Sequence, residues 1–157
     1  MKISYLKTSM GWVRAEESNG ELAAIEFVSR RGGVSDDSNH RTRVIKQLRE
    51  YFEGKRKRFS NFAKATLDGE LGGTGFQRAV WREISKIPFG ETITYKELAK
   101  RAGRAKAIRA AASACGKNPM PIVIPCHRVV GSSGSLGGYS GGLDKKKWLL
   151  RHEGARN

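Results

Sequence analysis

The sequence predicts an α/β (α+β) protein in which a small N-terminal α/β domain precedes a mostly helical C-terminal domain. Three observations predict this class. Short runs of β-forming residues separated by turn residues fill the first 30 positions, helix-capping patterns follow later, and a Gly-rich stretch at residues 69–75 lies between them. We therefore expect an N-terminal scaffold domain over residues 1–70 and a C-terminal domain over residues 71–157.

The composition indicates an intracellular protein with a polyanionic partner. The 157 residues carry a net charge of +15, from 30 Lys and Arg against 15 Asp and Glu. Nucleic acid is the simplest partner for such a charge, although a solvated basic surface would give the same number. No apolar run approaches the roughly 18 residues of a membrane span, and the N-terminus lacks the apolar core of a signal peptide.

Cysteine and histidine usage indicates neither a disulfide scaffold nor a metal site. The chain has only two cysteines, Cys115 and Cys126, which suits a reducing compartment. The three histidines are scattered, and no Cys pair has a zinc spacing. We expect no metal ion, and Cys115 to be a bystander on a helix.

The N-terminal part is predicted to be a three-stranded hairpin arrangement followed by one helix. The strands are expected over residues 3–6, 12–15 and 22–28, and the pair Asn19-Gly20 predicts a tight turn between the last two. Apolar residues then recur at helical spacing, which predicts an amphipathic helix over residues 39–53 that ends at Gly54. This part shows no catalytic signal of its own.

Two capping patterns open the helices of the C-terminal part. Thr74 with Gln77 has the form of a capping box, and the helix after it carries a core stripe of Phe76, Val80, Trp81, Ile84 and Ile87. Thr94 with Glu97 repeats the pattern and opens a short helix over residues 95–101. A glycine-containing turn and a further helix over residues 105–114 then match a helix-turn-helix.

The second helix of this pair is thin and basic. Alanines dominate it, and Arg104, Lys106 and Arg109 supply positive charge. A slim basic helix can approach a nucleic-acid backbone or enter a groove. The alternative is a small-residue helix that packs closely in the core and leaves its charges in water.

Residues 124–129, Ile-Pro-Cys-His-Arg-Val, form the stretch with the clearest chemical signal. The apolar run at residues 122–124 predicts a buried strand that ends at Pro125, because proline lacks an amide proton and fixes its own φ. Cys126 would then lie on a tight turn beside His127, as a candidate nucleophile. The alternative is a buried cysteine that acts as a small apolar residue.

A Gly- and Ser-rich loop over residues 131–142 follows, and it contains a single aromatic residue, Tyr139. The loop is either the wall of a pocket or a plain linker. The last predicted helix, residues 143–152, packs Trp148, Leu149 and Leu150 inward and ends at Glu153-Gly154.

Residues 76–153 resemble the methylated-DNA–protein-cysteine methyltransferases, or alkylguanine-DNA alkyltransferases, a family that repairs O6-alkylguanine directly. The motifs match the family in their residues, in their order along the chain and in their separations. The motifs are Pro88-Phe89-Gly90, Thr94-Tyr95, Ala107-Ile108-Arg109-Ala110, Asn118-Pro119, Ile124-Pro125-Cys126-His127-Arg128-Val129, Tyr139-Ser140-Gly141-Gly142 and His152-Glu153-Gly154.

The resemblance implies a catalytic group of five residues. Cys126 would accept the alkyl group, activated through a water molecule by His127, which Glu153 would orient. Tyr95 would give a proton to the departing guanine, and Asn118 would brace the helical and active-site segments. The product would be a stable thioether, so the protein would act once and be consumed.

The resemblance also implies how DNA is bound. The partner would be double-stranded DNA that contains an alkylated guanine, bound by a monomer through the minor groove and with the damaged base flipped out. Arg109 would fill the vacated position in the base stack. The other expected DNA contacts are Tyr95, Lys106, Arg104 and Arg128, and the expected pocket residues are Tyr139, Ser140, Val129, Met120 and Pro121.

Neither a cofactor nor a metal is implied, since the alkyl group comes from the lesion and the cysteines of the zinc-binding family members are absent here. O4-alkylthymine in DNA is a second candidate substrate. Two other readings compete. A lesion-binding protein of this fold without the acceptor cysteine is opposed by Cys126, and a thiol hydrolase would need further motifs that the sequence lacks.

Overall fold

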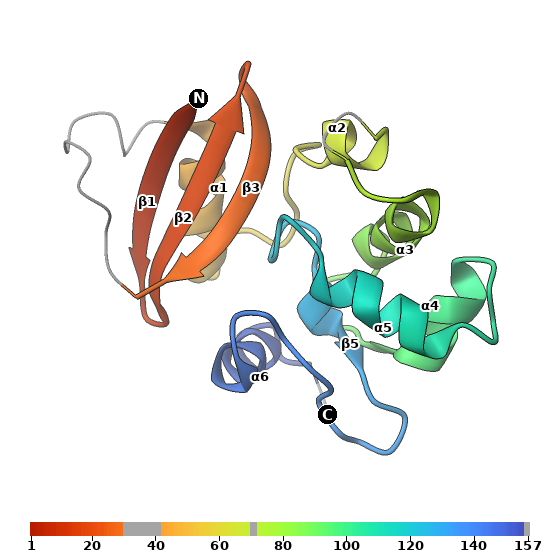
Figure 1. Cartoon of the computed structure of the whole chain (residues 1–157). Coiled ribbons are helices and arrows are strands. Elements are labelled where there is room, and N and C mark those ends of the chain that lie inside the picture. Colours follow the sequence, from red (N-terminus) through yellow and green to blue (C-terminus); the bar gives the residue numbers. More distant parts are fainter. Residues whose placement is uncertain (30–41, 70–71, 156–157) are drawn as a thin grey trace.

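A computed structural model describes residues 1–29, 42–69 and 72–155. The N-terminal part is an antiparallel sheet in the order β1 (Lys2–Thr8), β2 (Gly11–Ser18) and β3 (Glu21–Val28), with helix α1 (Arg43–Phe52) against one face (Figure 1). The three predicted strands are confirmed. The predicted hairpin turn is confirmed as well, and Asn19 and Gly20 have the positive φ values, 51° and 81°, that a tight two-residue turn requires.

Helix α1 is confirmed, and its start is fixed by a side chain. The Oγ1 atom of Thr42 accepts a hydrogen bond from the amide of Ile45 at 3.3 Å, which caps the helix. The first predicted positions, 39–41, lie outside the described residues. The buried face of α1 carries Val44, Ile45, Leu48 and Tyr51, which pack against the sheet and against the second half of the chain.

The C-terminal part is mostly helical, as predicted. Its elements are α2 (Lys64–Leu67), α3 (Gly75–Ser85), β4 (Ile93–Thr94), α4 (Tyr95–Arg101), α5 (Ile108–Gly116), the 3₁₀ helix Cys126–Arg128, β5 (Val129–Val130) and α6 (Leu143–His152). Strands β4 and β5 pair in parallel, with Ile93 beside Val129. This pairing connects the start of α4 to the end of the segment that contains Cys126.

The two capping predictions have different outcomes. The box at α3 is confirmed: the Thr74 amide donates to Gln77 Oε1 at 2.8 Å, and the Gln77 amide donates to Thr74 Oγ1 at 3.1 Å. At α4, Thr94 Oγ1 accepts from the Glu97 amide at 3.1 Å, but the Glu97 carboxylate pairs with Arg101 instead of returning to the cap. The second capping box is therefore only half formed.

Helices α4 and α5 pack together as a helix-turn-helix (Figure 1). Helix α5 begins at Ile108 and not at residue 105, because residues 104–107 form a turn closed by the bond from the Ala107 amide to the Arg104 carbonyl at 2.9 Å. The buried side of α5 consists of small side chains, Ala111, Ala114 and Cys115. The indole of Trp81 on α3 donates to the Ala114 carbonyl at 2.9 Å and holds α5 against α3.

The predicted buried strand at residues 122–124 is wrong. Ile122 has a φ of 77°, and the segment is a turn closed by an isolated bridge between Pro121 and Ile124. The amide group of Asn118 imposes this turn, since its Nδ2 donates to the Ile124 carbonyl at 2.7 Å and its Oδ1 accepts from the Met120 amide at 2.9 Å. A short strand therefore follows the cysteine, as β5, and does not present it.

The two parts of the chain share contacts and one cluster of buried apolar side chains. The Ile25 amide of β3 donates to the Pro119 carbonyl at 2.9 Å, and Tyr51 of α1 reaches Glu153 after α6. The predicted boundary falls at residues 70 and 71, which lie outside the described residues, so the division into two domains stays a prediction. Within the described ranges no helix is long and apolar enough to cross a membrane.

Candidate active site

Cys126 lines a cavity of about 390 Å³ at the meeting point of α4, α5 and the loop before α6. Cys126 begins the 3₁₀ helix and is only 4% exposed. Its neighbours on the cavity wall come from positions far apart in the sequence. They are Tyr95, Ala112, Cys115, Gly116, Gly137, Gly138, Tyr139 and Ser140.

The surroundings of Cys126 favour its thiolate. The nearby Cys115 thiol lowers the pKa of Cys126, as do the side chain of Asn118, the positive charge of Lys146 and a backbone amide, although burial opposes them. The thiolate is the nucleophilic form of cysteine. These surroundings favour the ionised form of Cys126, which is the form that the expected role as nucleophile requires.

Glu153 lies directly after α6 and collects hydrogen bonds from four residues. Oε1 is 2.8 Å from His127 Nε2, 2.7 Å from the Tyr51 hydroxyl and 2.9 Å from Arg128 Nη2. Oε2 accepts from Arg128 Nε at 2.9 Å and from the Gly90 amide at 3.3 Å. Burial opposes ionisation, but the bonds and charges of His127 and Arg128 hold the pKa of Glu153 well below its usual range. Glu153 is thus a fully buried carboxylate with its lone pairs occupied.

His127 is a neutral base whose tautomer is set by Glu153. Burial lowers the pKa of His127 and outweighs the opposing effect of the carboxylate. A carboxylate only accepts hydrogen bonds, so Nε2 carries the ring proton and Nδ1 has a free lone pair. Nδ1 is buried and has no hydrogen-bond partner within the described part of the chain. His127 can therefore accept a proton at Nδ1.

Tyr95 is the first residue of α4 and lies in the cavity wall. Burial, together with the nearby Cys115 and Cys126, raises the pKa of Tyr95 to about 12, so its hydroxyl keeps its proton near neutral pH. The loop before α6 passes close to the ring: a Cβ on Gly137 would lie 2.5 Å from the Tyr95 hydroxyl, and Gly137 has a φ of 71°. Only glycine suits that position.

Lys146 is a part of the site that the sequence analysis missed. Although it is a lysine, it is 0% exposed, and its Nζ donates to the Val129 carbonyl at 2.6 Å, the Gly138 carbonyl at 3.1 Å and the Tyr95 hydroxyl at 3.4 Å. Lys146 ties the strand after Cys126 to the loop and to α4. Helical spacing was the available signal, since Lys146 precedes the buried Leu149 and Leu150 by three and four positions.

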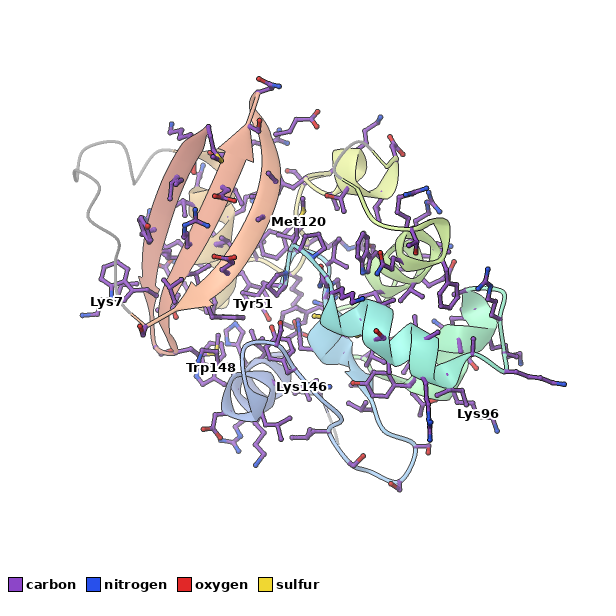
Figure 2. The ribbon with its side chains drawn as sticks, in the orientation of Figure 1. Lys7, Tyr51, Lys96, Met120, Lys146 and Trp148 are labelled. Carbon is purple, nitrogen blue, oxygen red and sulfur yellow. The ribbon has the colours of Figure 1, made fainter. Side chains whose placement is uncertain are left out.

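Tyr51 lies on the helix predicted over residues 39–53, and no sequence signal indicated its contact with Glu153. It is also fully buried. In Figure 2, Tyr51 lies between the sheet and the second half of the chain, and Lys146 lies on α6. Tyr51 contacts Glu153 and Lys146 contacts Val129, so both side chains reach the surroundings of Cys126 from other elements.

The expected pocket residues divide into two groups. Tyr139 and Ser140 line the cavity, and the Tyr139 hydroxyl is buried with no partner in the described ranges. Val129, Met120 and Pro121 lie outside the lining of this cavity, and their contact with a substrate stays a prediction. Met120 is buried against Thr66, Val129 offers its carbonyl to Lys146, and Pro121 borders a different hollow.

The expected DNA-contacting residues also divide. Arg104, Lys106 and Arg109 are exposed at the start of α5 and in the turn before it, and the Arg104 guanidinium lies over the Phe76 ring at 4.7 Å. Arg128 is only 6% exposed and is held by Glu153 and by the Ile87 carbonyl, at 2.6 Å. The expected contact of Arg128 with DNA is therefore wrong for this structure, because its guanidinium is committed inside the protein.

Comparison with known proteins agrees with these features. Residues 75–155 match the family described as "6-O-methylguanine DNA methyltransferase, DNA binding domain". A mimivirus protein named "Probable methylated-DNA--protein-cysteine methyltransferase" is 42% identical over 155 residues, which cover 98% of this chain and 97% of that protein. A Shigella flexneri methylated-DNA--protein-cysteine methyltransferase is 46% identical over 123 residues, 78% of this chain and 63% of its own length.

Solved structures extend the likeness to the whole fold. The crystal structure of Mycobacterium tuberculosis OGT in complex with DNA superposes with a TM-score of 0.81 at 31% identity, over 97% of this chain and 92% of that one. The resemblance drawn from the motifs and the α+β fold class are confirmed. The chain belongs to the methylated-DNA–protein-cysteine methyltransferase family.

Proposed function

We propose that this protein repairs O6-alkylguanine in DNA by moving the alkyl group irreversibly to the sulfur of Cys126. One observation carries the proposal: a buried thiol, acidified by its neighbours, shares a cavity with a protonated tyrosine and lies next to a neutral His127 that Glu153 orients. This arrangement supplies a nucleophile, a base and a proton donor.

The reaction begins with the proton of Cys126. It passes to Nδ1 of His127, with a water molecule as carrier, because adjacent residues on the chain direct their side chains apart. The Nε2 proton of His127 remains bonded to Glu153, whose carboxylate stabilises the imidazolium that forms. The product of this step is a thiolate beside a histidinium–carboxylate pair.

The transfer step exchanges one bond for another. The thiolate attacks the alkyl carbon, a bond forms between sulfur and carbon, and the bond between that carbon and guanine O6 breaks with its electron pair left on the base. Tyr95 gives its proton to the base as the bond breaks. The thioether on Cys126 has no activated carbonyl for water to attack, so each protein molecule reacts once.

Access to the buried thiol requires that the damaged base leave the duplex. Cys126 is 4% exposed and lies at a cavity wall, so a base within the stack cannot reach it. Helix α5 bears Arg109 on its exposed side and has alanines where a larger side chain would hinder entry into the minor groove. We propose that Arg109 fills the vacated stack while Arg104 and Lys106 contact phosphates.

The test measures the DNA. A duplex with a single O6-methylguanine is mixed with increasing amounts of protein, and restored guanine is counted by digestion at a restriction site that the lesion blocks. We expect the repaired amount to rise in a one-to-one ratio with protein and then stop. Cys126→Ala should bind the lesion and repair none, whereas repair beyond one lesion per protein would overturn the single-turnover mechanism.

Two further measurements test the second candidate substrate and the oligomeric state. A duplex with O4-methylthymine tests the second candidate substrate, and repair of it would extend the function to thymine. Sedimentation of the free protein tests the expectation of a monomer.

A further inference from the structure

Cys115 is the second thiol of the cavity that contains Cys126. Both cysteines are free and buried, at 6% and 4% exposure, and both line the cavity of about 390 Å³. Cys115 lies in the last turn of α5, and its Sγ donates to the carbonyl oxygen of Cys126 at 3.8 Å. The helix that bears Arg109 at its start therefore places a thiol beside the proposed alkyl acceptor at its end.

We propose that Cys115 is a positioning residue for the alkyl transfer, and that its thiol donates a hydrogen bond to the sulfur of Cys126 once that sulfur is a thiolate. This inference rests on the proposed function and adds a residue to its machinery. The sequence pattern suggested a bystander role for Cys115, whereas the structure places its side chain in the wall of the cavity that contains Cys126.

The hydrogen bond can change acceptor because a thiol has one proton and a rotatable bond. The carbonyl oxygen of Cys126 accepts that proton in the structure, and the sulfur of Cys126, on the same cavity wall as Cys115, is the second acceptor that we propose. A hydrogen bond to a charged acceptor is roughly twice as strong as one to a neutral acceptor. Loss of the Cys126 proton therefore turns the Cys115 thiol from the oxygen toward the sulfur, and releases the carbonyl oxygen to accept from a guanine edge.

The acidities of the two thiols agree with these roles. The nearby Cys115 thiol is the largest influence that lowers the pKa of Cys126. Proximity to Cys126, together with burial, raises the pKa of Cys115 above its ordinary value. These directions make Cys126 the more acidic of the two thiols.

The substitution of Cys115 leaves the other charged and titratable groups around Cys126 chemically unchanged. They come from four elements: Tyr95 from α4, Lys146 from α6, Tyr139 from the loop before α6, and the His127–Glu153 pair from the 3₁₀ helix and the end of α6. A change in the acidity of Cys126 on replacing Cys115 can thus be assigned to the lost donor.

The experiment compares Cys115→Ala, Cys115→Ser and the control Ser113→Ala, which removes a small polar group from the exposed side of the same helix. Two rates are measured across pH: single-turnover methyl transfer from an O6-methylguanine duplex, and alkylation of Cys126 by iodoacetamide without DNA. Trypsin cuts after Arg109, Lys117 and Arg128, so the two thiols fall on separate peptides and are counted separately by mass.

We expect Cys115→Ala to raise the pH midpoint of methyl transfer and of alkylation by about one unit. Each reaction of the variant should then be about tenfold slower than that of wild type at pH values below the midpoints of both proteins, and unchanged at pH values above them. Cys115→Ser keeps a donor and should restore the wild-type midpoint, and Ser113→Ala should not move it. Cys115→Val fills the space without a donor and repeats the test if Ala leaves a void that unfolds the protein.

The two readouts separate this inference from the proposed function. A wild-type protein that reacts with iodoacetamide but takes no methyl from DNA would contradict the proposed function. A wild-type protein that takes the methyl with the same midpoint as Cys115→Ala, or a Ser variant shifted as far as the Ala variant, would overturn the role of Cys115 alone.

Discussion

The hydroxyl of Tyr51 donates a hydrogen bond of 2.7 Å to the carboxylate of Glu153, which lies 102 positions later in the sequence. The same carboxylate oxygen accepts from His127. Helix α1 therefore reaches the proposed base through a single intermediate group. The N-terminal part, in which the sequence shows no catalytic signal, helps to hold the carboxylate of Glu153.

Replacement of Tyr51 by Phe should weaken both stability and repair. A buried carboxylate loses one charge-assisted donor, which costs about 1.5–3 kcal/mol of unfolding free energy. Repair should slow several-fold, since Glu153 orients His127 less firmly. Denaturant unfolding and single-turnover repair measure the two effects. Tyr5→Phe, which alters a buried tyrosine of β1, serves as the control and should repair at the wild-type rate.

Stability should fall as the pH falls from neutral. The folded-state pKa values of His127 and Glu153 lie below their ordinary values of 6.5 and 4.5. As the pH drops through each ordinary value, the unfolded chain takes up a proton that the folded chain does not, so stability is lost first near 6.5 and again below 4.5.

The variant His127→Gln separates the loss of stability near pH 6.5 from the loss below pH 4.5. Glutamine can still donate to Glu153 but does not titrate, so the variant should lose stability only below about 4.5, the ordinary value for Glu153. Urea unfolding at intervals from pH 7 to 4 provides the comparison. Parallel curves for wild type and variant between pH 7 and 5 would contradict the account of His127.

Lys146→Met should slow repair by more than about tenfold. The substitution removes the donor shared by Val129, Gly138 and Tyr95, and with it a positive charge that lowers the pKa of Cys126. Buried carbonyls left without a donor cost about 1–3 kcal/mol each, so stability should fall as well. Repair is measured where the variant is still folded.

Lys147→Met is the matched control for that substitution. Lys147 is the next residue of α6 and is exposed, so its replacement by Met removes the same charge without removing a buried contact. Its repair rate and stability should stay near those of wild type. If both methionine variants slowed repair equally, a general effect of charge on DNA binding would replace the buried role of Lys146.

Arg109→Ala should impair repair of duplex DNA while leaving reaction with the free base O6-methylguanine unchanged. The side chain is exposed on α5 and remote from the hydrogen bonds around Cys126, so only the flipping step should suffer. The ratio of the two rates is the measurement. Lys7→Ala, on the exposed side of β1, removes one charge elsewhere and should change neither rate.

The sequence predicted elements whose causes are local. The reciprocal bonds of Thr74 and Gln77 and the turn at Asn19-Gly20 depend on a few adjacent residues, and both are confirmed. The strand at residues 122–124 was wrong because the side chain of Asn118 folds that apolar run into a turn. Hydrophobic pattern alone does not reveal such a bond.

In the site, too, features that depend on adjacent residues could be predicted, and features that depend on distant residues could not. The motif around Cys126 and His127 pointed to the candidate reactive segment, since its residues are adjacent. Lys146 and Tyr51 were missed as site residues because their partners lie on other elements, and burial of a lysine runs against its usual preference for water. Arg128 was expected to contact DNA, but Glu153 holds its guanidinium inside the protein, a long-range contact that the motif does not reveal.

The most direct test of the central claim is the mass of the protein after incubation with duplex DNA that carries one O6-methylguanine. We predict a gain of one methyl group per protein, found after trypsin digestion on the peptide that contains Cys126 and not on the one that contains Cys115. Repair of the DNA with no change in protein mass, or a methyl group on any other peptide, would contradict alkyl transfer to Cys126.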